Sequence, residues 1–265
     1  MSKGKMKDLL ASIKDDTFET IVENDKLPEV VRSVMEYVVS ESAAKVLGSI
    51  IGMALPRING IFVNYKQARF ERSVEDALRI IVHRLNALES NVCYLSEEMM
   101  EKFRGIYVEW MLDNLYEERQ QDKVKYHVNG FINLMNNEAN DNLMLMFFNT
   151  LSELTTLDID VLRIYSEEST ENIYMLCQRY KLQPEQIQVI KEKLSRLGLL
   201  QSRNDEQRDY NLDEIVTYLT KVEKDNKSRN PKGVKLPTIK KPNRAESYKI
   251  TSLGRSYLNV ISFDE

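Results

Sequence analysis

The chain contains little of the material from which compact chemical sites are built: 9 glycines, 6 prolines, 2 cysteines and 2 histidines among 265 residues. Few glycines and prolines argue against a β-sandwich, whose many turns require them, and favour long helices. The few cysteines and histidines leave almost nothing for a zinc site or a disulfide scaffold. Glycine-rich phosphate loops and the His-Glu-x-x-His and Gly-x-Ser-x-Gly motifs are missing from the sequence. We therefore expect no cofactor, no metal site and no enzymatic activity.

The N-terminal sequence and the cysteines favour the cytoplasm. Basic residues in Met1–Asp8 are followed only by Leu9-Leu10-Ala11 before charged residues return at Lys14, so we expect no secretory signal. Cys93 and Cys177 both lie among helix-forming residues, which is typical of reduced, packed thiols. We expect a cytoplasmic protein, with peripheral attachment to the inner face of the membrane as the open alternative.

The most apolar stretch, residues 43–63, is too interrupted for an ordinary membrane span. Lys45 and Arg57 bracket only 11 residues, whereas a helix needs about 20 to cross a bilayer. Small or helix-breaking residues recur there at every fourth position: Gly48, Gly52, Pro56 and Gly60. Such a stripe lets another helix approach closely. Two interpretations stay open: a helix contact within the fold or between copies, and contact of residues 43–63 with an anionic membrane.

Apolar residues at three- and four-residue intervals predict an antiparallel helical bundle over residues 27–154, after a flexible segment at 1–26. One expected helix begins near Ser96. The two histidines, His83 and His127, lie on helix flanks and are expected to be packing or surface residues rather than ligands. The expected inward-facing residues include Val74, Leu78, Ile81, Phe103, Ile106, Tyr107, Trp110, Met111, Val124, Val128, Phe131, Ile132, Leu143, Phe147, Leu151 and Leu154.

The pattern changes after Thr155, where shorter elements are expected. Three helices are predicted: 157–165, 171–180, and one that begins at Pro184 and is stopped by Gly198 in the left-handed conformation. Short strands are predicted at 199–202 and 248–251, and Thr251 then caps a last helix that runs to Ile261. Between the two strands we expect an inserted helix from Asn211 to about Lys224.

Two sequences carry a resemblance: Leu194-Ser-Arg-Leu-Gly-Leu-Leu200 and Tyr248-Lys-Ile-Thr-Ser-Leu-Gly254. With the three helices before them, they resemble the winged helix-turn-helix family. The resemblance implies that residues 155–265 form a winged-helix domain with a small β-hairpin. The inserted helix and a lysine-rich loop, together about 211–247, depart from the family pattern. Winged helices bind proteins as well as DNA, so the resemblance leaves both functions open.

A second resemblance concerns the whole arrangement of an apolar, small-residue-rich helix, a bundle and a winged-helix end. Gly48, Gly52, Pro56 and the junction Thr155-Thr156-Leu157 are similar to bacterial proteins of the Abi-alpha (phage abortive-infection) type. That resemblance implies work in phage defence or prophage biology, and it provides no catalytic residues.

Charge is unevenly distributed along the chain. Ten basic and three acidic residues lie between Lys221 and Lys249, in a chain whose net charge is −4. A basic end on an acidic body is typical of contact with a polyanion. The third helix contributes glutamines, Gln183, Gln186 and Gln188, that could reach base edges. The predicted polyanion contacts are Lys191, Lys193 and Arg196 in the third helix and Lys232, Lys235, Lys240, Lys241 and Arg244 in the loop.

Together these patterns predict a mainly α protein, with an N-terminal helical bundle and a C-terminal winged-helix domain. The favoured function is that of a non-enzymatic bacterial interaction or effector protein, with a protein partner or a second copy of itself. The alternative is a winged-helix DNA-binding transcriptional regulator, because helical modules without a reaction centre and basic wings occur in both classes.

Overall fold

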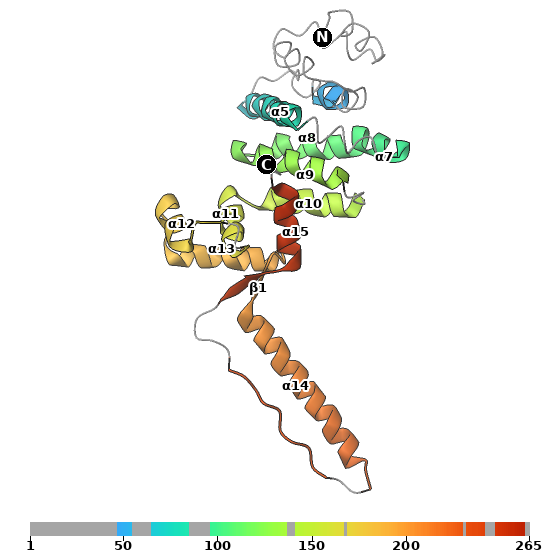
Figure 1. Cartoon of the computed structure of the whole chain (residues 1–265), viewed down its shortest axis with the longest axis vertical. Coiled ribbons are helices and arrows are strands. Elements are labelled where there is room, and N and C mark those ends of the chain that lie inside the picture. Colours follow the sequence, from blue (N-terminus) through green and yellow to red (C-terminus); the bar gives the residue numbers. More distant parts are fainter. Residues whose placement is uncertain are drawn as a thin grey trace, which may run out of the picture. The chain divides into compact units, whose positions relative to one another are not determined.

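The computed structural model describes residues 47–54, 65–84, 96–136, 141–166, 169–229, 232–241 and 247–262. These residues are mainly helical, with one small two-stranded antiparallel sheet (Figure 1), which confirms the expected fold class at this level. The chain divides into two units: unit 1 is Met1–Thr156 with Asn259–Glu265, and unit 2 is Leu157–Leu258. The expected segment 1–26 and the first expected bundle helix lie outside the described residues.

Unit 1 is built from helices that share an apolar core. They comprise residues 47–54, α5 (Tyr65–His83), α7 (Glu97–Lys102), the π-helical η1 (Phe103–Tyr107), α8 (Val108–Glu117), the 3-10 turn η2 (Gln121–Lys123), α9 (Val124–Asn136) and α10 (Asp141–Glu153). α5 contacts both α8 and α9, and α10 contacts the same two helices. The fully buried aromatic rings of Phe103 and Phe131 meet edge to face, with centroids 5.8 Å apart.

The π-helical segment corrects one part of the predicted core. Ile106 was expected to face inward with Phe103 and Tyr107, but it is 45% exposed, whereas Val108 is fully buried. A π-helix adds a residue to the turn, so positions after Phe103 move round the helix relative to an α-helical count. The 3.6-residue period therefore placed the wrong residue inward, while Tyr107 and Met111 are buried as predicted.

α10 contains a second correction. Leu143 is exposed, and Met144 takes the inward position beside Phe147 and Leu151. The prediction failed because the run Leu143-Met-Leu-Met-Phe-Phe148 is apolar throughout and fits more than one helical face. Phe147 lies against α9 at Gly130, where a Cβ atom would come within 2.0 Å of the ring. Glycine at 130 is therefore what allows α9 and α10 to approach.

Unit 2 contains three short helices followed by the sheet: α11 (Thr156–Tyr165), α12 (Ile173–Tyr180), α13 (Pro184–Arg196), β1 (Leu200–Ser202) and β2 (Tyr248–Ile250). The strands pair antiparallel, with Leu200 opposite Ile250. Gly198 has a positive φ of 74°, which confirms the predicted left-handed stop after α13. The Thr251 hydroxyl accepts the N–H of Gly254 at 2.9 Å, so Thr251 caps α15 (Ser252–Ile261) as predicted.

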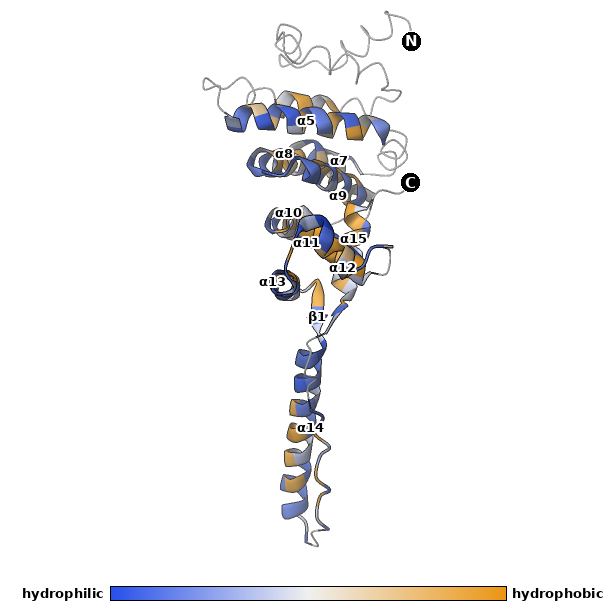
Figure 2. Cartoon of the chain, turned by 90° about the vertical axis from the view of Figure 1, so that its left-hand side faces the viewer, coloured by the Kyte–Doolittle hydropathy of each residue, from blue (hydrophilic) through white to orange (hydrophobic). Residues whose placement is uncertain are grey.

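The inserted helix is longer than expected. α14 (Arg203–Asn226) begins eight residues before the predicted start at Asn211. The Ser202 hydroxyl accepts the N–H groups of Asn204 and Asp205, both at 3.2 Å, so the last residue of β1 is also the N-cap of α14. The missed turns are polar, and Figure 2 shows that the apolar residues of α14 lie toward its middle. The sequence around Arg203 therefore has no apolar residues at helical spacing that would indicate the start of α14.

Residues 232–241, which we call the return segment, run back along α14 (Figures 1 and 2). Their two ends are attached to the helix by hydrogen bonds. The Asp225 carboxylate accepts the backbone N–H groups of Lys232 at 3.0 Å and Gly233 at 2.8 Å. Near the start of the helix, the Asn211 side chain donates to the carbonyl of Lys240 and accepts its N–H.

Candidate functional site

The turn between α12 and α13 is built from local hydrogen bonds. The Asn172 side chain accepts the N–H of Met175 at 3.0 Å and so caps α12. Lys181 ends that helix with a positive φ of 54°. The backbone N–H of Gln183 donates to the side chain of Gln186 at 2.9 Å, and Pro184 occupies the first turn of α13. Two helices joined by a tight turn follow directly from these residues.

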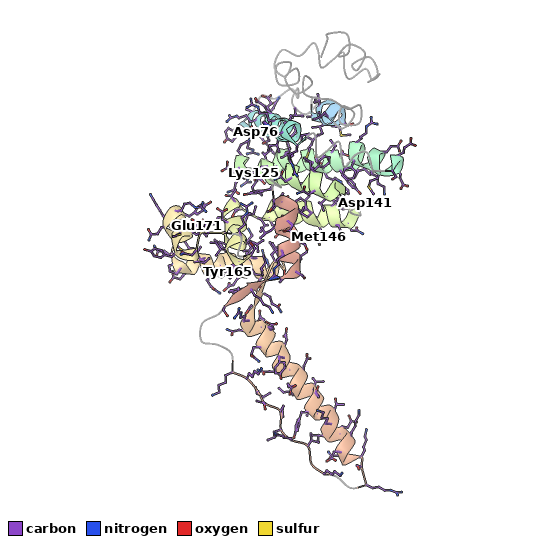
Figure 3. All side chains as sticks on the ribbon, in the orientation of Figure 1. Asp76, Lys125, Asp141, Met146, Tyr165 and Glu171 are labelled. Atoms are coloured by element: carbon purple, nitrogen blue, oxygen red, sulfur yellow. The ribbon has the colours of Figure 1, made fainter. Side chains whose placement is uncertain are left out.

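Ion pairs fix α12 to α11. Arg179 contacts Asp160 at 2.8 Å and Glu171 at 2.9 Å, and the Tyr180 hydroxyl donates to the same Asp160 carboxylate at 2.8 Å. Figure 3 marks Glu171, which precedes α12, and Tyr165, the last residue of α11. Polar contacts therefore attach α12 to α11, and Leu176, Ile187 and Leu194 of α12 and α13 are buried.

Most polar residues of α13 that were expected to reach a nucleic acid contact their own unit instead. Lys193 pairs at 2.6 Å with Asp158, whose side chain is only 3% exposed. The Lys191 ammonium lies 5.9 Å from the centre of the Tyr165 ring. Gln188 donates to the Tyr248 hydroxyl at 3.0 Å, and Gln186 caps the helix. Of the three basic residues predicted for α13, Arg196 has the most exposed position.

The outward face of α13 is not basic. Its exposed residues at four- and three-residue spacing are Glu185, Val189, Glu192 and Arg196, so two acids and a valine share it with one arginine. Val189 is 65% exposed, and Tyr174 on α12 is 70% exposed. A groove of about 750 Å³ lies at the α12–α13 turn, lined in part by Tyr174, Leu182 and Ile187. We name Tyr174, Met175 and Val189, together with this groove, the α12–α13 surface.

The lysine-rich loop presents its cations to solvent where it is described. Lys232, Lys235, Lys240 and Lys241 are all exposed, and Arg244 lies outside the described residues. The Lys240 ammonium stands 4.8 Å from the centre of the Tyr210 ring, a cation–π contact. The four lysines belong to the return segment, whereas Lys191, Lys193 and Arg196 belong to α13. The predicted polyanion contacts are therefore divided between two elements.

Only half of the predicted small-residue stripe can be located. Gly48 and Gly52 lie on the partly exposed side of helix 47–54, while Leu47, Ile50, Ile51 and Ala54 are fully buried. Pro56 and Gly60 lie outside the described residues. Among the residues that are described, no helix has the length and apolar character needed to cross a bilayer.

Unit 1 contains a buried charge cluster that the sequence did not reveal. The Glu118 carboxylate contacts the Lys123 ammonium at 2.5 Å and the Nε2 atom of His127 at 3.3 Å. Lys123 is 2% exposed and His127 is fully buried. The N–H groups of Arg119 and Gln120 also donate to Glu118, both at 2.8 Å. The cluster thus closes the turn from α8 to α9, beside a cavity of about 460 Å³.

The contacts of this cluster determine its protonation. Burial alone would raise the pKa of Glu118, but the hydrogen bonds from His127 and Lys123 outweigh burial and bring that pKa to about 2. Burial lowers the pKa of His127 below its ordinary value, and the nearby Lys123 adds to this effect, while Glu118 opposes it. His127 is therefore neutral near pH 7, and Glu118 is ionised.

Other cavity-lining residues in this region support the fold as well. Gln120 accepts the N–H of Thr156 at 3.0 Å, and Asn114 donates to the carbonyl of Trp110 at 2.8 Å. The part of the chain that the structure describes has no group of three or more histidine, cysteine or acidic side chains placed to hold a metal ion. The sequence could have indicated this cluster only through the spacing of Lys123 and His127, which share one helical face.

Comparison with known proteins finds no matching family model, no matching curated protein and no matching solved structure. The resemblances to winged helices and to Abi-alpha proteins therefore stay predictions.

Proposed function

We propose that this chain is a non-enzymatic interaction protein that binds a protein partner through the α12–α13 surface of a winged-helix module. The order α11, α12, α13, β1, β2 and α15 supports the winged-helix interpretation, with α14 and the return segment in the place of the wing. The phage-defence role implied by the Abi-alpha resemblance would be carried out through such contacts.

One observation favours a protein partner over DNA at this surface. The outward face of α13 has Glu185, Val189 and Glu192 where a DNA-reading helix would present donors and cations. Lys193 already pairs with Asp158. Carboxylates would repel a phosphate backbone, whereas exposed aromatic and aliphatic side chains such as Tyr174 and Val189 are the kind that anchor protein interfaces.

The test is site-specific photo-crosslinking in the cells that produce the protein. A photoreactive residue placed at Tyr174 or Val189 is expected to give a discrete protein adduct that mass spectrometry identifies. The same residue at Asn149, which is exposed on α10, is the matched control and should give no such adduct. Tyr174→Asp combined with Val189→Asp should abolish binding of the identified partner. Crosslinks to nucleic acid instead of protein at Tyr174 and Val189 would refute the proposal.

The exposed lysines of the return segment support a second candidate, the binding of a nucleic-acid backbone. Lys232, Lys235, Lys240 and Lys241 follow each other along one extended segment. Backbone contacts of this kind release counterions, so affinity falls steeply as salt rises. Gel-shift titrations at several salt concentrations give the slope of the logarithm of the binding constant against the logarithm of the salt concentration. Changing all four lysines to glutamine should lower the magnitude of this slope by about three to four. If the unaltered protein shifts no duplex even at low salt, this candidate function is excluded.

A further inference from the structure

α14 leaves an apolar stripe uncovered along its middle. Leu212, Val216 and Leu219 recur at four- and three-residue spacing and are 53%, 60% and 58% exposed, and Ile215 borders them. No residue of α14 is buried. A stripe with this spacing is the pattern by which one helix packs on another.

The return segment does not cover this stripe. Its hydrogen bonds are made to Asn211 and Asp225, and Lys240 stands over Tyr210. At about 100° per residue, Asn211 and Asp225 lie about 0.3 and 0.4 of a turn away from the centre of the stripe, and Tyr210 lies on the opposite side of the helix. The chain thus protects one side of α14 and leaves the apolar side open.

The charges along α14 and just beyond its end are self-complementary. The N-terminal half of α14, residues 203–216, has five acidic residues against two arginines, and the part after Leu219 is basic. The acidic set is Asp205, Glu206, Asp209, Asp213 and Glu214, and the basic set is Lys221, Lys224, Lys227 and Arg229, which outnumber Glu223 and Asp225. A second α14 running in the opposite direction would place each acidic half against a basic half. The dipoles of two antiparallel helices would also interact favourably.

We propose that α14 is a self-association surface, on which a second copy of this chain packs antiparallel about a two-fold axis near Thr217. Such an interface is isologous, because the same stripe faces itself. The two-fold axis places Leu212 opposite Val222 of the second copy. It also brings Asp213 within about one turn of Lys224 of the second copy, on the same flank of the stripe, because both residues lie about 100–120° round the helix from Leu212. Two helices of about 36 Å are long enough for a pairing of this kind. The proposal does not depend on the α12–α13 surface.

The length of the apolar stripe sets the expected strength. Stable interfaces bury about 1,200 to 2,000 Å² in total, with an apolar centre and a polar rim. Four or five apolar residues from each copy form only a small centre, so we expect a reversible dimer that dissociates on dilution. Sedimentation of the full chain over a wide range of micromolar concentrations should show the monomer and the dimer exchanging.

A charge exchange tests the antiparallel arrangement. Asp213→Lys should weaken the dimer at least about tenfold, because it places a second cation near Lys224 of the other copy, and Lys224→Asp should do the same by pairing two carboxylates. The two substitutions in one chain should restore the dimer, as should an equimolar mixture of the two single variants. A parallel pairing would bring each position opposite itself, so the doubly changed chain would regain nothing.

Two further variants separate the apolar and polar contributions. Leu212→Asp with Leu219→Asp should leave only monomer, with the helix content seen by circular dichroism retained. Glu185→Lys on α13 reverses an exposed charge outside α14 and should leave the dimer unchanged. A full chain that sediments as a monomer at every concentration, or a dimer that survives the double leucine change, would overturn the proposal. Neither result bears on the crosslinks expected at Tyr174.

Discussion

α9 in unit 1 and α14 in unit 2 obtain their structure from different sources. In α9 even the polar residues His127 and Asn129 are fully buried, whereas in α14 no side chain is buried. α14 is supported instead by the Ser202 cap and by exposed ion pairs such as Glu223–Lys227. Exposed pairs of this kind contribute only a few tenths of a kcal/mol each.

This comparison shows that helicity and burial are separate properties of a sequence. When a helix packs in the core, its apolar residues are buried, so they are not available to bind partners. A helix held by caps and local ion pairs keeps its apolar residues accessible, and on α14 these are Leu212, Val216 and Leu219. Substitutions in unit 1 should therefore affect stability, and those on α14 should affect association.

The largest effect is expected at the buried charge cluster. Glu118→Gln takes the negative charge away from Lys123, which is 2% exposed. Loss of one member of a buried ion pair costs about 3–5 kcal/mol. Denaturant unfolding followed through the fluorescence of Trp110, the single tryptophan, reports on unit 1 and measures this loss.

The neighbouring Glu117 is the matched control for that experiment. Its side chain is exposed and pairs at 2.5 Å with Lys66, itself more than one third exposed. Glu117→Gln should change the free energy of unfolding by less than about 1 kcal/mol. Equal losses for the two variants would show that the Glu118 cluster is not the source of the stability.

The next largest difference in stability is expected when the same substitution is made at a buried and at an exposed leucine. Leu112 in α8 is fully buried, and Leu212 in α14 is 53% exposed. Leu112→Ala should cost about 3 kcal/mol, because it removes buried apolar area and leaves a cavity. Leu212→Ala should change the free energy of unfolding by less than about 0.5 kcal/mol when measured in dilute, monomeric protein. A large loss from Leu212→Ala would mean that the monomer itself buries the stripe.

A smaller difference in stability is expected between alanine substitutions at two glycines of unit 1. A Cβ atom at Gly130 would come within 2.0 Å of the Phe147 ring, whereas one at Gly105 would meet nothing within 4 Å. Gly130→Ala should cost about 1–3 kcal/mol, since Phe147 is itself buried and has little room to move. Gly105→Ala should be neutral or slightly stabilising, because alanine favours a helix. Thermal unfolding of both variants gives the comparison.

Most of the fold could be predicted because its signals are local. Gly198, Thr251 and Pro184 each have a backbone role that only a few residue types fill, and all three fill it. Ile106 and Leu143 were assigned to the core wrongly for a physical reason. The first follows a π-helical turn, which no apolar period announces, and the second belongs to a run that is apolar on every side.

The candidate sites were harder to predict, because residue type does not specify the partner of a side chain. Lys193 was expected to reach a polyanion, yet Asp158 holds it at 2.6 Å. Gln186 was expected to reach a base edge, yet it caps its own helix. The Glu118 cluster was missed because it joins residues on both sides of a turn. The lysines of the return segment are exposed, and their contact with a polyanion stays a prediction.

The smallest predicted effect is a dependence of stability on pH that arises from His127. Its pKa in the folded protein is lowered from the ordinary 6.5, so below that pH the unfolded chain binds a proton that the folded chain does not. The free energy of unfolding should therefore fall as the pH is lowered from about 7 to about 5. Glu118 adds a separate loss at lower pH, because its contribution is present above 4.5 and disappears as the pH falls toward about 2.

Replacing each histidine separately shows whether His127 causes the loss of stability between pH 7 and pH 5. His127→Gln should flatten the dependence between pH 7 and pH 5, since no group at that position then titrates. His83→Gln, at an exposed position, should leave the slope as it is in the unaltered protein. Urea unfolding at several pH values, followed through Trp110, measures both. If the slope persists in His127→Gln, the pH response of unit 1 originates elsewhere, and the contrast between the buried cluster of α8–α9 and the solvated charges of α14 loses its electrostatic basis.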